Sequence, residues 1–169
     1  HALLAYGGGD FTEVGELTLE GRSAEVKIAK AGRVTLDSRR DKIRLQQAGV
    51  VRGSSSFSTL DIALLTDEAL LSTRYGSLQV HELGNACRHV DLTSEYTDVQ
   101  LGFAKTQALE VELTYDDKVQ TSFNEALGKL EVRKAGEDLR QNILSGKTRP
   151  SAPRYVGVKV RAAGGRLTL

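Results

Sequence analysis

The chain has 169 residues and a formal net charge of +1, and 40% of its residues are hydrophobic, which suits one domain with a real core. Lys and Arg are interleaved with Asp and Glu along the whole chain, which argues against a basic face that binds nucleic acid or an anionic membrane by charge. Only 5% of the residues are aromatic, so the core must consist mostly of Leu, Val and Ile.

The cysteine count and the apolar stretches give few clues to location. Cys87 is the only cysteine, and a lone cysteine forms no internal disulfide. The longest apolar stretch, Leu60 to Leu65, contains Asp61 and is too short to span a bilayer, so we expect no transmembrane segment. The chain starts at His1 and contains no Met, which predicts a trimmed or processed segment of a longer protein.

One apolar pattern returns along the chain: an apolar residue, six others, a second apolar residue, any residue, and a third apolar residue. Clear copies begin at Leu19, Leu36, Leu71, Leu92, Phe123 and Val160. A degenerate copy begins at Gly53, and a copy shortened by one residue runs from Leu113 to Val119. Gly, Ser and Asp stand where each copy must bend.

The second apolar anchor advances by a near-constant step. From Val26 it moves by 17, 17, 18, 21 and 20 residues, to Ile43, Leu60, Leu78, Val99 and Val119. Within each copy the apolar residues alternate with polar ones, as in a strand with one buried side. We therefore predict an all-β fold, a single-stranded β-helix (solenoid) with rungs of about 17–21 residues. An antiparallel β-sandwich is the alternative.

One stretch, residues 137–155, interrupts the pattern. Glu137 to Leu144 contain helix formers and predict a short helical turn or an irregular excursion. Ser145 to Arg154 are rich in Gly, Lys, Pro and Ser, and predict a surface loop. Val156 to Leu169 then predict a final strand pair that rejoins the sheet, so residues 1–169 form a single β-helix domain.

Three phrases, "STRYGSLQVHELG", "SEYTDVQLGFA" and "LTYDDKVQT", resemble the repeated Lys-Tyr-Gly/Ser-Asp-Val-x-Leu phrases of adhesin-like, head-GIN-type β-helix proteins of bacteria. The resemblance covers Val34 to Leu169, although Ser23 and Arg40 stand where later rungs have Tyr75 and Tyr96. It implies a right-handed coil, also favoured by the general preference for right-handed parallel connections. It further implies export to the periplasm, outer membrane or cell surface. It supplies no catalytic residues.

Tyr75, Tyr96 and Tyr115 are the candidate binding residues, because they hold the same or nearly the same place in successive rungs. One interpretation is an aromatic strip that stacks on sugar rings. The other is a ladder of rings that pack on one another at a corner of the solenoid. Counting alternate residues from Leu71 places Tyr75 on the interior side, which favours the ladder.

His81, Glu82, Cys87 and His89 form the one cluster with the residue types of a metal site. Their spacing matches no zinc motif, and the valines beside the histidines place both rings on loops or outward faces. We predict a solvated turn here, and neither a metal nor a cofactor.

Asp116 and Asp117, with Asp98 one rung away, have the residue types for acid–base catalysis or calcium binding. All three occupy polar turn positions, where Asp is favoured for hydrogen bonds to its own backbone. The glycine-rich segment from Tyr6 to Asp10 lacks the Lys-Ser or Lys-Thr of a phosphate loop and predicts a turn. We therefore predict no catalytic residues.

Three functions remain open on this evidence. The first is a non-enzymatic cell-envelope module, adhesin-like or structural, that binds a glycan or an envelope or host protein. The second is a self-assembling scaffold similar to bactofilins, and the third is a carbohydrate-active β-helix enzyme. A functional surface is expected beside the interruption at residues 137–155, or along the corner that holds Tyr75 and Tyr96.

Overall fold

A computed structural model describes residues 2–128, 130–135, 140–149 and 151–169. The elements are β1 (Ala2–Ala5), β2 (Gly8–Arg22), β3 (Glu25–Arg39), β4 (Lys42–Ser56), β5 (Thr59–Leu83), β6 (His89–Leu101), β7 (Leu109–Asp116), β8 (Gln120–Ser122), the 3-10 turn η1 (Glu125–Leu127), β9 (Glu131–Ala135), β10 (Gln141–Lys147), β11 (Val156–Ala163) and β12 (Arg166–Thr168). Within this described part, no helix has the length and apolar character that crossing a bilayer requires.

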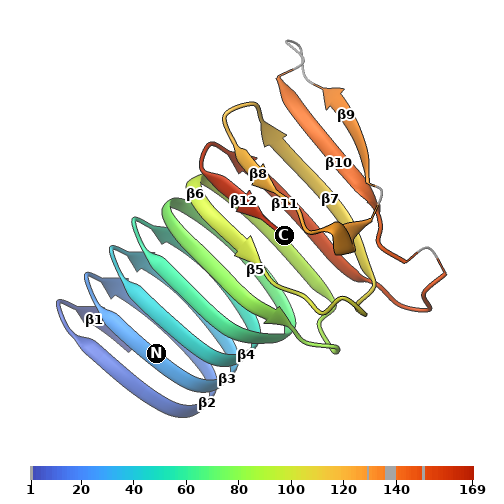
Figure 1. Cartoon of the computed structure of the whole chain (residues 1–169). Coiled ribbons are helices and arrows are strands. Elements are labelled where there is room, and N and C mark those ends of the chain that lie inside the picture. Colours follow the sequence, from blue (N-terminus) through green and yellow to red (C-terminus); the bar gives the residue numbers. More distant parts are fainter. Residues whose placement is uncertain (1, 129, 136–139, 150) are drawn as a thin grey trace.

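The predicted β-solenoid is confirmed. Strands β1 to β6 pair with their neighbours in chain order, and every one of these pairs is parallel. Figure 1 shows the long strands lying one over the next as successive turns of one coil. Parallel strands require a crossover connection between them, and here each turn of the coil returns the chain to the side on which the next strand begins. This arrangement excludes the antiparallel sandwich as the architecture of these rungs.

The predicted anchors form inward columns along the stack. The first anchors face one another across adjacent rungs in the order Leu19, Leu36, Gly53, Leu71, Leu92, Val160 and Leu113. The second anchors Val26, Ile43 and Leu60 are equally in register, as are Leu78, Val99 and Leu167. The apolar members are at most 4% exposed. This core of Leu, Val and Ile replaces the aromatic residues that the chain lacks.

Gly53 holds an anchor position because no side chain fits there. Its φ is +128°, and a Cβ at this position would lie 1.9 Å from the carbonyl oxygen of Leu36. Any other residue would therefore force the two rungs apart. The degenerate copy in the sequence is thus a true rung that lacks one apolar side chain.

Two sequence matches do not occupy the columns. In the rung formed by β7 and β8, Thr121 and not Val119 is in register with Leu167, although Val119 is buried. Val132, the last anchor of the copy that begins at Phe123, is 58% exposed. It lies on β9, which pairs antiparallel with β10 outside the coil. The copy of the apolar pattern that begins at Phe123 therefore does not form a rung.

The last rung of the chain is not the last rung of the stack. Strand β11 lies between β6 and β7 and pairs parallel with both. Strand β12 likewise lies between β6 and β8. The loop of residues 102–108, called the skip loop here, therefore connects β6 to β7, which lie two strand spacings apart along the stack, about 9.6 Å. The C-terminal segment fills the level left vacant, so the final strand pair rejoins the sheet in an interior position (Figure 1).

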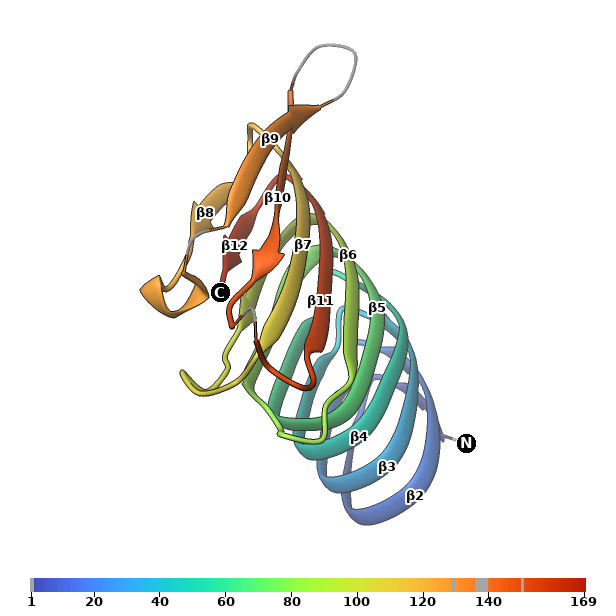
Figure 2. The same ribbon diagram turned by 90° about the vertical axis from the view of Figure 1, so that its right-hand side faces the viewer.

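The interruption at residues 137–155 differs from the prediction. Gln141–Lys147 form strand β10, which pairs antiparallel with both β7 and β9. The expected helical turn is therefore wrong for residues 141–144, and residues 137–139 lie outside the described residues. The predicted surface loop begins at Thr148, three residues later than expected. Figure 2 shows the β9–β10 hairpin and the first rungs at opposite ends of the stack.

One corner of the coil has the same backbone conformation in successive rungs. Its residues have φ between 47° and 59°, the left-handed region, and they are Tyr6, Ser23, Arg40, Phe57, Tyr75 and Tyr96. The following residue is buried at Ala24, Asp41, Ser58 and Thr97. The equivalence of Ser23, Arg40, Tyr75 and Tyr96 in the sequence is thus confirmed.

The left-handed residue also reverses the alternation of side chains, so counting by twos fails across this corner. Leu71 and Thr73 point inward as expected, but Tyr75 is 44% exposed. The interior placement predicted for Tyr75 is therefore wrong.

A buried carboxylate stabilises this corner. Asp41 is 3% exposed, and its Oδ1 accepts the N–H of Ala24 at 2.7 Å. Its Oδ2 accepts the Ser38 hydroxyl at 2.8 Å and the N–H of Arg39 at 3.1 Å. These bonds connect two rungs, because Ala24 belongs to the rung before. A buried carboxylate that accepts several N–H and O–H groups offsets part of its desolvation cost.

Asp41→Ala is expected to lower the free energy of unfolding by at least about 2 kcal/mol, because two backbone N–H groups and a hydroxyl lose their acceptor. Asp37→Ala is the matched control. The Asp37 carboxylate is exposed and accepts one long bond, at 3.5 Å from Ser54, so its loss should change stability by less than about 0.5 kcal/mol. Urea titration measures both, and equal effects would refute the structural role of Asp41.

Leu167→Ala is expected to cost about 2–5 kcal/mol, because this fully buried side chain fills the second-anchor column of the inserted rung. Val132→Ala removes the same kind of anchor by sequence pattern, but from an exposed position, and should cost less than about 0.5 kcal/mol. Thermal or urea unfolding of the two variants compares them directly. A large loss at Val132, or none at Leu167, would contradict the placement of the final strand pair.

Candidate functional site

Phe57, Tyr75 and Tyr96 form an aromatic ladder on the outside of the left-handed corner. The ring centroids of Phe57 and Tyr75 lie 5.1 Å apart at an interplanar angle of 14°. Those of Tyr75 and Tyr96 lie 5.3 Å apart at 3°. The three side chains are 44–54% exposed, so the rings stack on one another in contact with solvent. Phe57 was not among the sequence candidates, although it precedes Tyr75 by one rung.

The stacking leaves few ring faces open. Both faces of Tyr75 are covered, one by Phe57 and one by Tyr96. The far face of Tyr96 lies against Gly164, where an added Cβ would come within 2.8 Å of the ring. Sugar rings stack on aromatic faces, whereas this ladder presents mainly ring edges and two phenol hydroxyls. The geometry therefore favours mutual packing at Tyr75 and Tyr96, the second of the two interpretations.

Tyr115 lies apart from this ladder. It is half-buried at the end of β7 and makes an edge-to-face contact with Phe123, with centroids 6.3 Å apart. Burial, the larger cause, and the nearby Asp117 carboxylate raise the pKa of its phenol. The three candidate tyrosines are thus not brought together in one site.

The four residues with metal-ligand side chains are dispersed. Nε2 of His81 lies 2.8 Å from Oδ1 of Asp61 in the previous rung, and this pair is exposed. Cys87 is fully buried in an inward position. His89 is half-buried beside Gly157. Among the described residues, no group of three His, Cys, Asp or Glu side chains could hold a metal ion.

The aspartates take part in turns and surface pairs. Oδ1 of Asp116 accepts the N–H of Lys118 at 3.0 Å and that of Gly164 at 3.3 Å. Asp117 accepts the side-chain amide of Asn142 at 2.9 Å. Asp98 is exposed on β6. The arrangement of Asp116 agrees with the turn interpretation. Of the segment from Tyr6 to Asp10, only Tyr6 and Gly7 lie between β1 and β2, and the turn predicted there is wrong for residues 8–10, which belong to β2.

A pocket of about 610 Å³ lies at the opposite end of the rungs, where three loops meet. They are the β5–β6 loop (84–88), the skip loop (102–108), and the β10–β11 loop, called the return loop and described at residues 148–149 and 151–155. The lining residues are Asn85, Thr106, Gln107, Ala108, Arg149, Ser151, Ala152, Pro153, Arg154, Tyr155 and Val156. The pocket arises because the chain skips a level at one loop and returns to it through another.

Backbone hydrogen bonds tie the return loop to the rigid rungs. Thr148 donates its N–H to Leu109 O at 3.0 Å, and its hydroxyl accepts the N–H of Leu109 at 2.9 Å. At the other end, Val156 donates to Ala108 O at 2.9 Å. Within the loop, the Tyr155 hydroxyl donates to Arg149 O at 2.5 Å. The pocket wall is therefore fixed at both ends and braced across its middle.

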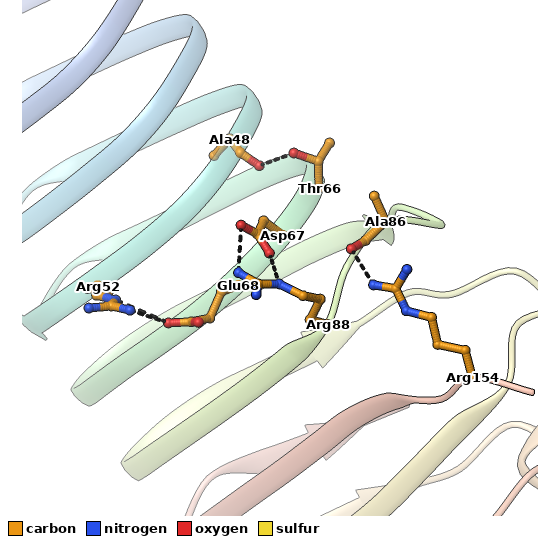
Figure 3. Close-up of polar contacts among 8 residues, drawn as sticks. All are labelled: Ala48, Arg52, Thr66, Asp67, Glu68, Ala86, Arg88 and Arg154. Carbon is orange, nitrogen blue, oxygen red and sulfur yellow. Dashed lines mark hydrogen bonds and ion pairs between the residues drawn. The ribbon is translucent and has the colours of Figure 1, made fainter.

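Two arginines from the return loop reach across to the other loops. Nη2 of Arg149 donates to Lys105 O at 3.3 Å, and Nη2 of Arg154 donates to Ala86 O at 3.1 Å. Figure 3 shows Arg154 extending toward Ala86, beside the Arg88–Asp67 pair. Arg88 binds Asp67 through two nitrogens, and this hydrogen-bonded pair lowers the pKa of the Asp67 carboxyl.

Gln107 is a buried polar side chain in the pocket wall. Its Nε2 donates to Gly84 O at 3.2 Å, whereas its Oε1 has no hydrogen-bond partner in the described part of the chain. An unmet buried acceptor costs about 1–3 kcal/mol. The wall therefore has a hydrogen-bonding capacity that the protein's own groups do not use.

Sequence reasoning placed a functional surface beside residues 137–155 but named none of the lining residues. Arg149, Arg154 and Tyr155 carry no motif, and the sequence places only the two arginines in a surface loop. The usable signal was the longer step between anchors after Leu78, which marks where loops leave the coil. Comparison with protein-family models, with curated proteins and with solved structures finds no match to this chain.

Burial raises the pKa of Cys87 from 9.0 to about 11, and backbone hydrogen bonds oppose this only in part. At pH 8 we therefore expect a disulfide reagent to label the folded protein at least about 100-fold more slowly than the urea-unfolded chain. Because the folded pKa is the higher one, stability from the neutral thiol is present below about pH 9. It is lost as the pH rises toward 11. Equal labelling rates in the two states would refute the burial of this thiol.

Proposed function

We propose that this protein is a non-enzymatic binding module of the cell envelope, adhesin-like in role, whose ligand is a glycan or a partner protein held at the loop pocket. The pocket carries the proposal, because its volume of about 610 Å³ lies in the range of ligand sites. Loops positioned by a rigid scaffold are where binding residues concentrate. The envelope location rests on the resemblance to exported adhesin-like proteins.

The residue types that line the pocket favour binding of a ligand over catalysis. Its described lining offers guanidinium, amide, phenol and hydroxyl groups around an apolar floor of Ala108 and Val156. General acid–base catalysis requires a proton donor and acceptor matched to the operating pH. Paired carboxylates, the usual choice in glycoside hydrolysis, do not occur among these described lining residues. The enzymatic alternative remains an outcome of the test below.

The scaffold alternative has one supporting observation. Strand β9 is the last strand of the sheet order and pairs only with β10 among the strands that the structure describes. A strand edge of this kind can pair with a strand of another copy. The pocket plays no part in such an assembly, so the two functions make different predictions.

The binding function predicts that a pocket-filling substitution removes the ligand without unfolding the protein. Ser151 is an exposed lining residue, so Ser151→Trp should fill the pocket at little cost in stability. Ser122→Trp, at an exposed position on β8, is the matched control. Both variants and the wild type are screened against glycans and matrix proteins, and hits are quantified by calorimetry. Affinity should fall at least about tenfold in Ser151→Trp alone.

Two results would contradict this function. Binding that Ser151→Trp and Ser122→Trp affect equally would place the ligand elsewhere. An absence of binding above background, combined with filaments in electron micrographs, would favour the scaffold, and turnover of a bound polysaccharide would favour the enzyme.

A further inference from the structure

The two arginines of the pocket differ from the other cations around it. Arg88 is paired with Asp67, and Lys147 lies 3.4 Å from a carboxylate oxygen of Glu110. Arg149 and Arg154 form no ion pair with any residue that the structure describes. Each uses a terminal nitrogen to bind a backbone carbonyl, which fixes its position without neutralising its charge. The pocket therefore contains two positioned positive charges outside ion pairs, of which that of Arg154 also contributes to the lowered pKa of the Asp67 carboxyl.

The remaining donors of these guanidinium groups are available to a ligand. A guanidinium has five N–H donors in a planar fork, and each arginine uses one nitrogen to bind a residue that the structure describes. Such forks match the paired oxygens of carboxylate, sulfate and phosphate groups. Asp67, the carboxylate beside Arg88 in Figure 3, does not compete for them, because Arg88 already binds both of its oxygens.

The rest of the pocket suits a ring-shaped body that carries hydroxyl groups. Ala152, Pro153 and Val156 supply apolar surface beside the Tyr155 ring, one side of which is occupied by Lys147 Nζ at 4.7 Å from the centroid. Asn85, Thr106 and Ser151 add amide and hydroxyl groups to the lining, which can form hydrogen bonds with ligand hydroxyls. A neutral apolar ligand would leave both the arginines and these polar groups unused.

From these three features we infer that the ligand of the pocket is an anionic sugar, a carbohydrate bearing carboxylate or sulfate groups. Arg149 and Arg154 bind the anionic group, and the apolar wall contacts the carbons of the sugar ring. The inference rests on the proposed function, since it assigns the chemical class of the ligand to the same pocket. It differs from attraction to a basic face, because the formal net charge is only +1 and acidic and basic residues are interleaved along the whole chain.

Calorimetric titration of the full chain with three oligosaccharides of equal length tests the inference. The probes are an oligogalacturonate, a sulfated heparin fragment and a neutral dextran fragment. The protein variants are Arg149→Gln, Arg154→Gln and the double variant, which keep polar side chains while removing charge. Arg22→Gln is the control, because Arg22 is an exposed arginine on β2, far along the stack from the pocket.

At least one acidic probe is expected to bind, and the dextran fragment at least about tenfold more weakly. Each single variant should raise the Kd of the acidic probe at least about tenfold, and Arg22→Gln should change it less than about twofold. Affinity should also fall as salt is added. Because both arginines are exposed, circular dichroism and the unfolding midpoint should not change.

The remaining outcomes separate the ligand class from the function. Dextran binding as tight as that of the acids, or acidic binding unchanged in the double variant, would overturn the anionic class. If Ser151→Trp abolished that binding, the proposed function would stand. If none of the three probes bound, the anionic-sugar inference would be overturned, and the broader glycan and protein screen would decide the function separately.

Discussion

The structure depends on the parallel backbone ladder between successive rungs. Strands β1 to β6 pair in chain order and β11 joins β6 to β7, so a side chain that points inward in one rung lies over the equivalent side chain of the next. A shift of one residue would turn the apolar columns toward solvent. A core of Leu, Val and Ile then suffices, because every rung buries the apolar side of its neighbour.

The corner with left-handed residues allows this ladder to continue around the coil. A single residue with φ near +55° reverses the direction of the chain within a short space, and a small or polar residue follows it on the inside. An L-residue in this conformation is strained, and repetition in successive rungs indicates that the inter-rung bonds outweigh that strain. Asp41 adds side-chain bonds at this corner, and the exposed aromatic ladder packs against its outer side.

The displaced C-terminal rung connects the fold to the pocket at the loops. Because the skip loop rises by two levels, the chain must come back to fill the gap, and the return loop brings Arg149 and Arg154 to the ends of earlier rungs. The arginines bind the carbonyls of Lys105 and Ala86 and keep their charge. The irregular part of the chain thus supplies the arginines of the pocket, and the regular part supplies the rigid support.

The sequence by itself determined the coil. Apolar spacing was enough to identify the rungs, their anchors and the degenerate copy at Gly53, because local alternation and a regular step both follow from backbone geometry. Only the tertiary structure decided three features: the outward position of Tyr75, the strand at Gln141–Lys147, and the insertion of β11 beside β6. Each depends on non-local pairing or on one unusual φ value, and neither leaves a periodic signal. The pocket follows from that insertion, so its residues could not be found from spacing alone.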